Sequence, residues 1–151
     1  QNVTIVKQII CQRQLEQEVT QFLSETYRNK IIVDVACSYQ SAMTKASSEE
    51  YDFMVVDMSI PKYDESRGGE NRTLPTGGEL IINTLYDMGI MSKSIVLTQY
   101  DTFNEETINT IDERLKIDCG EVYMGYIKYN SNEEEWKHQL QTKIDKLCYR
   151  Y

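Results

Sequence analysis

Asp57 is the residue of this chain whose type and position best suit chemistry. It ends an apolar run, Phe53-Met54-Val55-Val56, and is followed by Ser59-Ile60-Pro61. A continuous apolar run predicts a central parallel strand that is covered on both faces. Open α/β sheets place their chemistry at the carboxyl ends of the strands, which is where this carboxylate would lie. An aspartate in that position could also cap a loop or neutralise a nearby lysine.

Predicted strands alternate with predicted helices on both sides of Asp57. Apolar, β-branched runs predict strands, and apolar residues at helical spacing predict helices. The strands are predicted at 3–6, 30–36, 53–56, 94–98 and 122–127, and the helices at 8–27, 41–50, 77–88, 104–115 and from Asn132 onward. This alternation specifies an α/β fold, a parallel sheet with helices on both faces. For five strands the flavodoxin-like order 2-1-3-4-5 is the commonest, and we expect it here.

The segment between the third strand and the third helix has two features of interest. The polar stretch from Lys62 to Thr76 is rich in turn residues and predicts a long loop. Gly77-Gly78 then opens the helix and could hold a phosphate on exposed N–H groups. The lysine and spacing of a P-loop are missing, so we expect a tight turn at these glycines instead.

Length and charge limit the class of protein. The chain has 151 residues, 40% of them apolar, and a net charge of −8, which predicts a single soluble domain over residues 1–151. It lacks the basic face that nucleic acids require, so no direct nucleic-acid contact is expected. No apolar run approaches the roughly 18 residues of a membrane span, so no membrane contact is expected either. The chain begins at Gln1 without a methionine, and a piece of a longer protein is one expectation.

Cysteine and histidine placement favours reduced thiols. Cys11, Cys37, Cys119 and Cys148 lie far apart, and His138 is the only histidine. These spacings do not suit a zinc site, and a domain of this size needs no disulfides. We therefore expect a cytoplasmic protein.

Four residues at or near strand ends make the chain resemble the CheY-like receiver domains of bacterial two-component signalling. Asp57-Met58-Ser59-Ile60-Pro61 resembles the family's third-strand motif, an aspartate followed by an apolar residue and a proline. Thr98 matches the family's Ser/Thr at the end of the fourth strand, and Lys128 matches its lysine at the end of the fifth. Tyr126 matches the aromatic residue two positions before that lysine. The resemblance covers essentially the whole chain.

The resemblance implies phosphoryl-transfer chemistry. In the family the aspartate, here Asp57, accepts a phosphoryl group from a phosphohistidine kinase. Thr98 would then bond a phosphoryl oxygen, Lys128 would pair with the same group, and the rotamer of Tyr126 would report the phosphorylated state. Because two negative groups meet in this reaction, cations must neutralise the developing charge. Magnesium, a hard cation held by carboxylates, supplies most of that charge.

Three departures from the family pattern indicate a pseudo-receiver that keeps the fold without the metal-dependent step. The family places an acidic pair directly after the first strand, where this chain reads Lys7-Gln8-Ile9. Lys7 could neutralise Asp57 in the metal's place. Thr98 is followed by the bulky Gln99, and Lys128 is followed by Tyr129 rather than by the usual proline.

The preferred hypothesis is a signalling module that is not an enzyme and that regulates an effector by protein–protein contact. Asp57, Lys128 and Lys7 would form a fixed charge cluster that needs no cofactor. The contact face would comprise the fourth helix, the fifth strand and the last helix, with an effector domain or histidine kinase as partner. The same face could form a homodimer, since five tyrosines gather near it: Tyr123, Tyr126, Tyr129, Tyr149 and Tyr151.

Two alternatives stay open. In one, Asp57 is a working phosphoacceptor, and Mg²⁺ is held by unusual acids. The acids in question are Asp64, Glu65, Glu70 and Asp101. In the other, a small ligand or nucleotide binds at the carboxyl ends of the strands under the Lys62–Thr76 loop.

Overall fold

The computed structural model describes residues 4–9, 13–64 and 72–148, and the side chains in these ranges except those of 4–9, 13–16, 29 and 148. A central sheet of five parallel strands runs through it in the order β2-β1-β3-β6-β9. The strands are β1 (Thr4–Ile9), β2 (Ile31–Ala36), β3 (Phe53–Val56), β6 (Lys93–Thr98) and β9 (Tyr123–Lys128). The four residues of β3 are all buried, as their continuous apolar run predicts.

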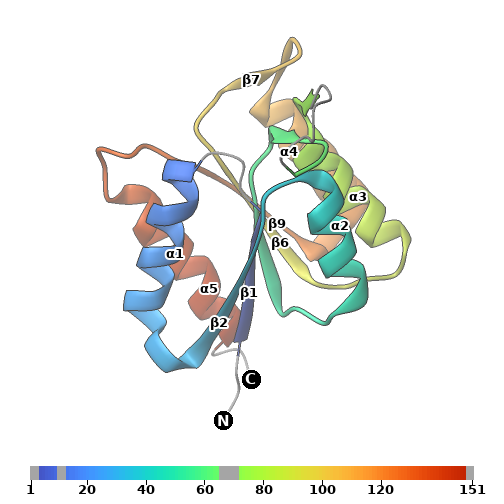
Figure 1. Ribbon diagram of the computed structural model, residues 1–151. Helices are drawn as coiled ribbons and strands as arrows, with labels where there is room; N and C mark the ends of the chain where they lie inside the picture. The colour runs from blue at the N-terminus through green and yellow to red at the C-terminus, as the bar shows by residue number, and fades with distance from the viewer. Residues whose placement is uncertain (1–3, 10–12, 65–71, 149–151) are drawn as a thin grey trace.

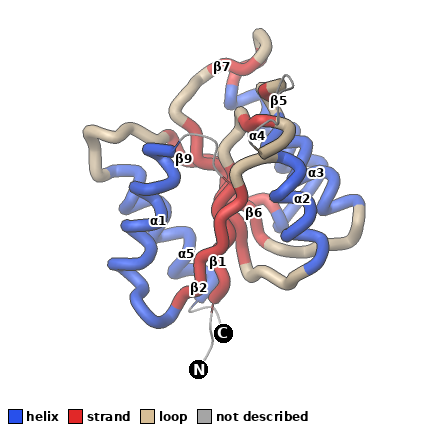
Figure 2. Tube along the Cα trace, viewed as in Figure 1, coloured by secondary structure: helices blue, strands red, loops and turns tan. Residues whose placement is uncertain are grey.

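Helices cover both faces of the sheet, which confirms the predicted α/β class. Figure 1 shows α1 (Arg13–Tyr27) and α5 (Glu135–Cys148) on one face, and Figure 2 shows the same two layers by element type. The opposite face carries α2 (Tyr39–Ser48), α3 (Gly77–Asp87) and α4 (Ile108–Cys119). Among the described residues, no helix combines the length and apolar character needed to cross a membrane.

Each layer has its own core. Under α1 and α5, Trp136, Leu140 and Ile144 pack onto Phe53, Val55 and Ile127 of the sheet. These three residues of α5 recur at every fourth position, so one side of the helix is buried against the sheet. Under α2, α3 and α4, the other faces of β3 and β6 are covered by two further clusters, one of which contains Ile60 and the other Met58. The segment after β3 therefore contributes side chains to the core.

The first strand is longer than predicted. It continues through Ile9, with Lys7 opposite Asp34 and Met54, and Ile9 opposite Val56. The predicted strand end after Val6 is therefore wrong, because backbone pairing to two neighbouring strands outweighs the polar character of Lys7 and Gln8. These two residues lie within the strand and not directly after it. Residues 10–12 follow the strand and lie outside the described residues.

A hairpin precedes α4 where helix was predicted. β7 (Thr102–Phe103) and β8 (Glu106–Thr107) pair antiparallel across Asn104 and Glu105, whose φ angles are 48° and 69°. Two consecutive positive φ angles define a tight hairpin turn and exclude α-helix. The helix predicted to begin at Asn104 begins instead at Ile108, because the Thr107 side chain accepts a hydrogen bond from the Thr110 N–H.

The remaining elements are short. β4 (Ile60–Pro61) and β5 (Thr73–Leu74) pair antiparallel, so the two ends of the predicted 62–76 loop are closed into a hairpin. Residues 65–71 lie outside the described residues. The 3-10 turns η1 (Arg28–Lys30) and η2 (Gly120–Val122) lead into β2 and β9. The last helix, predicted from Asn132 onward, begins at Glu135.

Candidate functional site

Asp57 lies at the carboxyl end of β3 in a buried position. Its residue is 6% exposed, and burial raises the pKa of its carboxyl group from 3.8 to about 7, although backbone hydrogen bonds from Met58 and Ser59 act in the opposite direction. The ion pairs among the described residues involve other carboxylates. The environment described around Asp57 thus favours its neutral form up to about pH 7, where an ordinary aspartate is fully ionised.

The start of α3 packs directly against the backbone of Asp57. The Gly78 N–H donates a 2.8 Å hydrogen bond to the Met58 carbonyl oxygen. A Cβ at Gly78 would lie 3.0 Å from the Cα of Met58 and closer still to the Asp57 carbonyl oxygen. Gly78 therefore allows close approach of helix and loop, and its N–H is already used. These contacts favour the tight packing role expected for Gly77-Gly78 over a phosphate cradle.

Thr98 is fully buried at the end of β6, but its hydroxyl bonds to its own loop. The Oγ1 accepts a 3.2 Å hydrogen bond from the Tyr100 N–H and donates to the Tyr100 carbonyl oxygen at 3.3 Å. Its backbone carbonyl accepts a 2.7 Å bond from the Tyr129 N–H. A proline after Lys128 could not donate that bond, so Tyr129 extends the pairing of β6 with β9.

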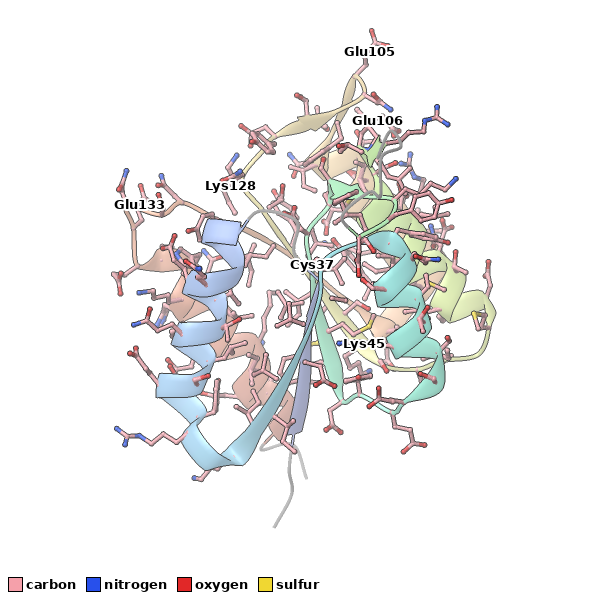
Figure 3. The ribbon with its side chains drawn as sticks, in the orientation of Figure 1. Cys37, Lys45, Glu105, Glu106, Lys128 and Glu133 are labelled. Atoms are coloured by element: carbon pink, nitrogen blue, oxygen red, sulfur yellow. The ribbon has the colours of Figure 1, made fainter. Side chains whose placement is uncertain are left out.

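Lys128 lies at the same edge of the sheet but pairs with a different aspartate. Its ammonium forms an ion pair with Asp101, in the loop after β6. Figure 3 places Lys128 at the end of the molecule that also carries Glu105 and Glu106 of the β7–β8 hairpin. Strands lie about 4.8 Å apart, so β3 and β9 are separated by about 10 Å with β6 between them. The predicted ion pair of Lys128 with Asp57 is therefore wrong, because Lys128 instead pairs with Asp101 in the loop after the adjacent strand β6.

The predicted switch tyrosine and its neighbours are mostly turned inward. The Tyr126 side chain is half-buried, and its hydroxyl donates a 2.8 Å hydrogen bond to Asn109 on α4. Tyr123 and Tyr129 are buried, and their hydroxyls bond Asp112 on α4 and Glu18 on α1. These two tyrosines hold helices to the sheet and cannot supply an exposed contact surface. Tyr149 and Tyr151 lie outside the described residues.

An arginine clamp that sequence reasoning missed joins three elements beside the site. Arg114 on α4 makes paired hydrogen bonds to Glu79 on α3, at 2.6 and 2.8 Å, and to Glu106 on β8, at 2.6 and 3.0 Å. The two carboxylates raise the pKa of the Arg114 guanidinium, while Arg114 lowers the pKa of Glu106. Glu79 is 35 residues away from Arg114 along the chain, so no local pattern signals the contact.

The carboxylates described at this edge are not arranged as the magnesium site that the receiver resemblance implies. Among the described residues, no three histidine, cysteine, aspartate or glutamate side chains gather in a group that could hold a metal ion. The sequence after β1 reads Ile10-Cys11-Gln12 and holds no carboxylate. Of the alternative acids, Asp101 pairs with Lys128 and Asp64 is exposed, while Glu65 and Glu70 lie outside the described residues. Lys7 lies in β1, and its side chain is not among those described.

Comparison with known proteins finds no matching family model but many similar solved structures. The chain superposes on the phosphorylated cyanobacterial phytochrome response regulator RcpA with a TM-score of 0.68 at 13% identity, over 99% of this chain and 96% of that one. The receiver domain of the Francisella response regulator 1452 gives a TM-score of 0.62 at 20% identity, over 99% and 98% of the two chains.

Two curated proteins are similar in sequence. The Detocs response regulatory protein DtcB of Enterobacter cloacae (strain JD6301) is 29% identical over 109 residues, which cover 67% of this chain and 71% of that protein. The uncharacterised protein y4jR of Sinorhizobium fredii is 24% identical over 116 residues, or 73% and 77% of the two chains.

Proposed function

Because the chain has the receiver-domain fold of response regulators, we propose that it is a receiver-like signalling module that regulates a protein partner by direct contact. It is not an enzyme in this proposal. Asp57 keeps the position of the phosphoacceptor but does not take part in the magnesium-dependent reaction.

The observation that carries the proposal is the state of the three residues that would handle a phosphoryl group. Asp57 is buried, and burial raises the pKa of its carboxyl group to about 7, so it is less readily ionised than an ordinary aspartate. The Lys128 ammonium is paired with Asp101, and the Thr98 hydroxyl is bonded to the Tyr100 backbone. Phosphoryl transfer to Asp57 requires an ionised nucleophile, a cation beside it and an oriented donor. Each of the three would first have to leave its present partner or surroundings.

The partner of the module would be an effector domain or a histidine kinase. We keep the face of α4, β9 and α5 as its contact surface and as the surface of a possible homodimer. Tyr123 and Tyr129 are buried, so these two side chains do not take part in that surface.

The test is phosphorylation by a small donor. The chain is incubated with acetyl phosphate and Mg²⁺, and its intact mass is measured beside that of Asp57→Asn. We expect neither protein to gain mass on incubation, while a receiver domain that carries the acidic pair gains a phosphoryl group under the same conditions. A magnesium-dependent mass gain in the wild type that is lost in Asp57→Asn would overturn the proposal.

A working phosphoacceptor is the second candidate, and one observation favours it. Asp57, Thr98 and Lys128 follow or end three successive strands at the same edge of the sheet, β3, β6 and β9. A modest movement of the loops after these strands would bring the three groups toward one site. In that case Mg²⁺ would have to release Asp101 from Lys128 or recruit an acid from the 62–76 loop. The mass experiment separates the two candidates.

A further inference from the structure

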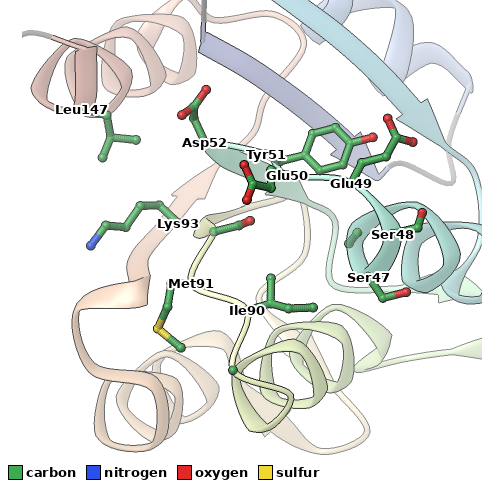
Figure 4. A pocket seen from close by; sticks show the side chains of 13 residues that line it. Ser47, Ser48, Glu49, Glu50, Tyr51, Asp52, Ile90, Met91, Lys93 and Leu147 are labelled. Atoms are coloured by element: carbon green, nitrogen blue, oxygen red, sulfur yellow. The ribbon is translucent and has the colours of Figure 1, made fainter.

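A second surface of interest lies at the amino ends of the sheet strands, whereas Asp57 lies at their carboxyl ends. A hollow of about 900 Å³ opens between the α2–β3 connection and the α3–β6 connection, lined by residues 46–52 and 89–93 and by Leu147 (Figure 4). We call it the amino-edge groove. Asp52 precedes β3 and Asp57 follows it, so the two sites are on the order of 16 Å apart at about 3.3 Å per strand residue. Both can be occupied at once.

The amino-edge groove is open along its length. Residues 47–50, Asp52, Gly89 and Met91 on its walls are all exposed, whereas only Ala46 and Tyr51 are buried. Small-molecule sites enclose most of the ligand's surface. An open groove suits a polypeptide segment that leaves one side in solvent.

The walls of the groove carry an excess of negative charge. The lining includes three carboxylates, those of Glu49, Glu50 and Asp52, but only one ammonium, that of Lys93 (Figure 4). The Lys93 ammonium donates a 3.1 Å hydrogen bond to the Glu121 carbonyl oxygen. The groove thus attracts a cationic segment.

A fourth carboxylate lies next to the groove floor. The buried Tyr51 hydroxyl donates a 2.7 Å hydrogen bond to Asp34 on β2. Burial, this bond and the charges of Asp34 and Glu49 all raise the pKa of the Tyr51 phenol, so the phenol stays neutral and adds no further negative charge to the groove. The bond also fixes the ring that forms the floor.

Apolar side chains lie on the α3–β6 connection. Met91 is 55% exposed and Ile90 is half-buried, while the half-buried Leu147 of α5 lies beside Asp52 (Figure 4). Met88, just before the lining residues in sequence, is 54% exposed. Methionine side chains adapt to the shape of an apolar partner and are common on peptide-binding surfaces. The groove therefore offers an acidic wall and an apolar wall side by side.

Backbone hydrogen bonds fix the two connections that border the groove. The Lys93 N–H donates to the Asp52 carbonyl oxygen at 3.2 Å, and the Ile90 N–H donates to the Leu85 carbonyl oxygen at 3.0 Å. Gly89 turns the chain after α3 with a φ of 81°. A pre-organised groove loses little conformational entropy when a segment binds.

We propose that the amino-edge groove docks a basic amphipathic segment of a partner protein, with its cations on Glu49, Glu50 and Asp52 and its apolar face on Ile90 and Met91. This contact does not depend on the chemistry at Asp57. It would let the module hold one partner at the amino edge while the other faces stay available.

Three synthetic peptides test the proposal, and binding is followed by fluorescence anisotropy and by backbone amide shifts. One peptide places lysine and leucine on opposite faces of a helix, one replaces its lysines with glutamate, and one replaces its leucines with serine. The Lys/Leu peptide should bind most tightly and shift amides of residues 46–52 and 89–93. Its affinity should fall as salt is added, because part of the attraction is electrostatic.

Matched variants separate the groove from the general acidity of the chain. Neutralising Glu49, Glu50 and Asp52 to Gln, Gln and Asn should weaken Lys/Leu binding about tenfold. Neutralising the exposed Glu133, Glu134 and Glu135 to glutamine, which removes the same charge at the start of α5, should change it less than about twofold.

The apolar wall has its own control. Met91→Ser should weaken Lys/Leu binding, whereas Ile117→Ser, at an 83% exposed position on α4, should not. The proposal would be overturned if the Glu49/Glu50/Asp52 and Glu133/Glu134/Glu135 variants weakened binding equally, or if the glutamate-substituted peptide bound as tightly as the Lys/Leu peptide. It would also be overturned if the amide shifts lay outside the groove, or if the Lys/Leu peptide did not bind at all.

Discussion

Replacing Asp57 with asparagine should stabilise the protein at neutral and alkaline pH but not at acidic pH. Burial raises the pKa of the native carboxyl group from 3.8 to about 7. In the unfolded chain the group ionises near its ordinary pKa. Asparagine has nearly the same shape and never ionises, so it removes the cost of burying a charge.

The sign and size of the effect follow from proton linkage. Below about pH 3.8 both states of the wild type hold the proton, and the group has no effect. As pH rises from 3.8 toward 7, the unfolded state loses its proton while the native state keeps it, so the wild type loses stability, and above about pH 7 that loss is complete. The gap between 3.8 and about 7 corresponds to roughly 4 kcal/mol at 1.36 kcal/mol per pKa unit. We expect Asp57→Asn to exceed the wild type by about 2 to 4 kcal/mol at pH 8 and to match it within about 1 kcal/mol at pH 4.

The assay is urea unfolding of wild type and Asp57→Asn at intervals from acidic to alkaline pH. Taking the difference between the two proteins cancels the other titrating groups. Asp101→Asn is the matched control, because it removes a carboxylate from an exposed ion pair at the same edge and should change stability by less than about 1 kcal/mol at either pH. If Asp57→Asn were less stable than wild type at pH 8, the carboxylate would be ionised and paired. Lys7 would then be the first lysine to replace.

Three further variants test the packing around the site, each by urea unfolding. Gly78→Ala should lower the free energy of unfolding by about 1 to 3 kcal/mol, because the alanine Cβ would clash with the backbone of Asp57 and Met58. Unchanged stability would mean that α3 can shift to accommodate the Cβ. Arg114→Met should lower the free energy of unfolding by about 2 kcal/mol, since it leaves the mostly buried Glu79 carboxylate without its partner. As a control, Lys137→Met breaks an exposed ion pair and should lower it by less than about 0.5 kcal/mol. Equal losses in the two variants would refute the stabilising role of the arginine clamp. Tyr129→Phe should lower the free energy of unfolding by about 1 kcal/mol, because it removes the hydrogen bond from the tyrosine hydroxyl to Glu18 on α1. Unchanged stability in this variant would show that packing alone holds the ring.

The layers of the fold were predictable because burial imposes a strong pattern. The apolar run of β3 and the stripe of Trp136, Leu140 and Ile144 on α5 are buried as their spacing predicts. Element ends were less predictable, because they depend on local conformations and on pairing. Asn104 and Glu105 resemble a helix start in sequence, yet their positive φ angles close a hairpin.

The candidate site was predictable in position but not in its contacts. The end of each strand could be placed, so Asp57, Thr98 and Lys128 were assigned to one edge of the sheet. Which partner each side chain takes depends on distances between strands and loops that no sequence spacing reports. Lys128 binds Asp101 and Arg114 binds Glu79, 35 residues away, and neither contact leaves a periodic signal.

The central claim is that the site at Asp57 does not operate as a magnesium-dependent phosphoryl switch. The most direct measurement is a backbone amide NMR spectrum with and without Mg²⁺ and beryllofluoride, which mimics an aspartyl phosphate. We predict an unchanged spectrum at millimolar magnesium, with Lys128 still paired to Asp101. Shifts that cluster at Asp57, Thr98 and Lys128 and spread to Tyr126 would show a working switch and contradict the claim.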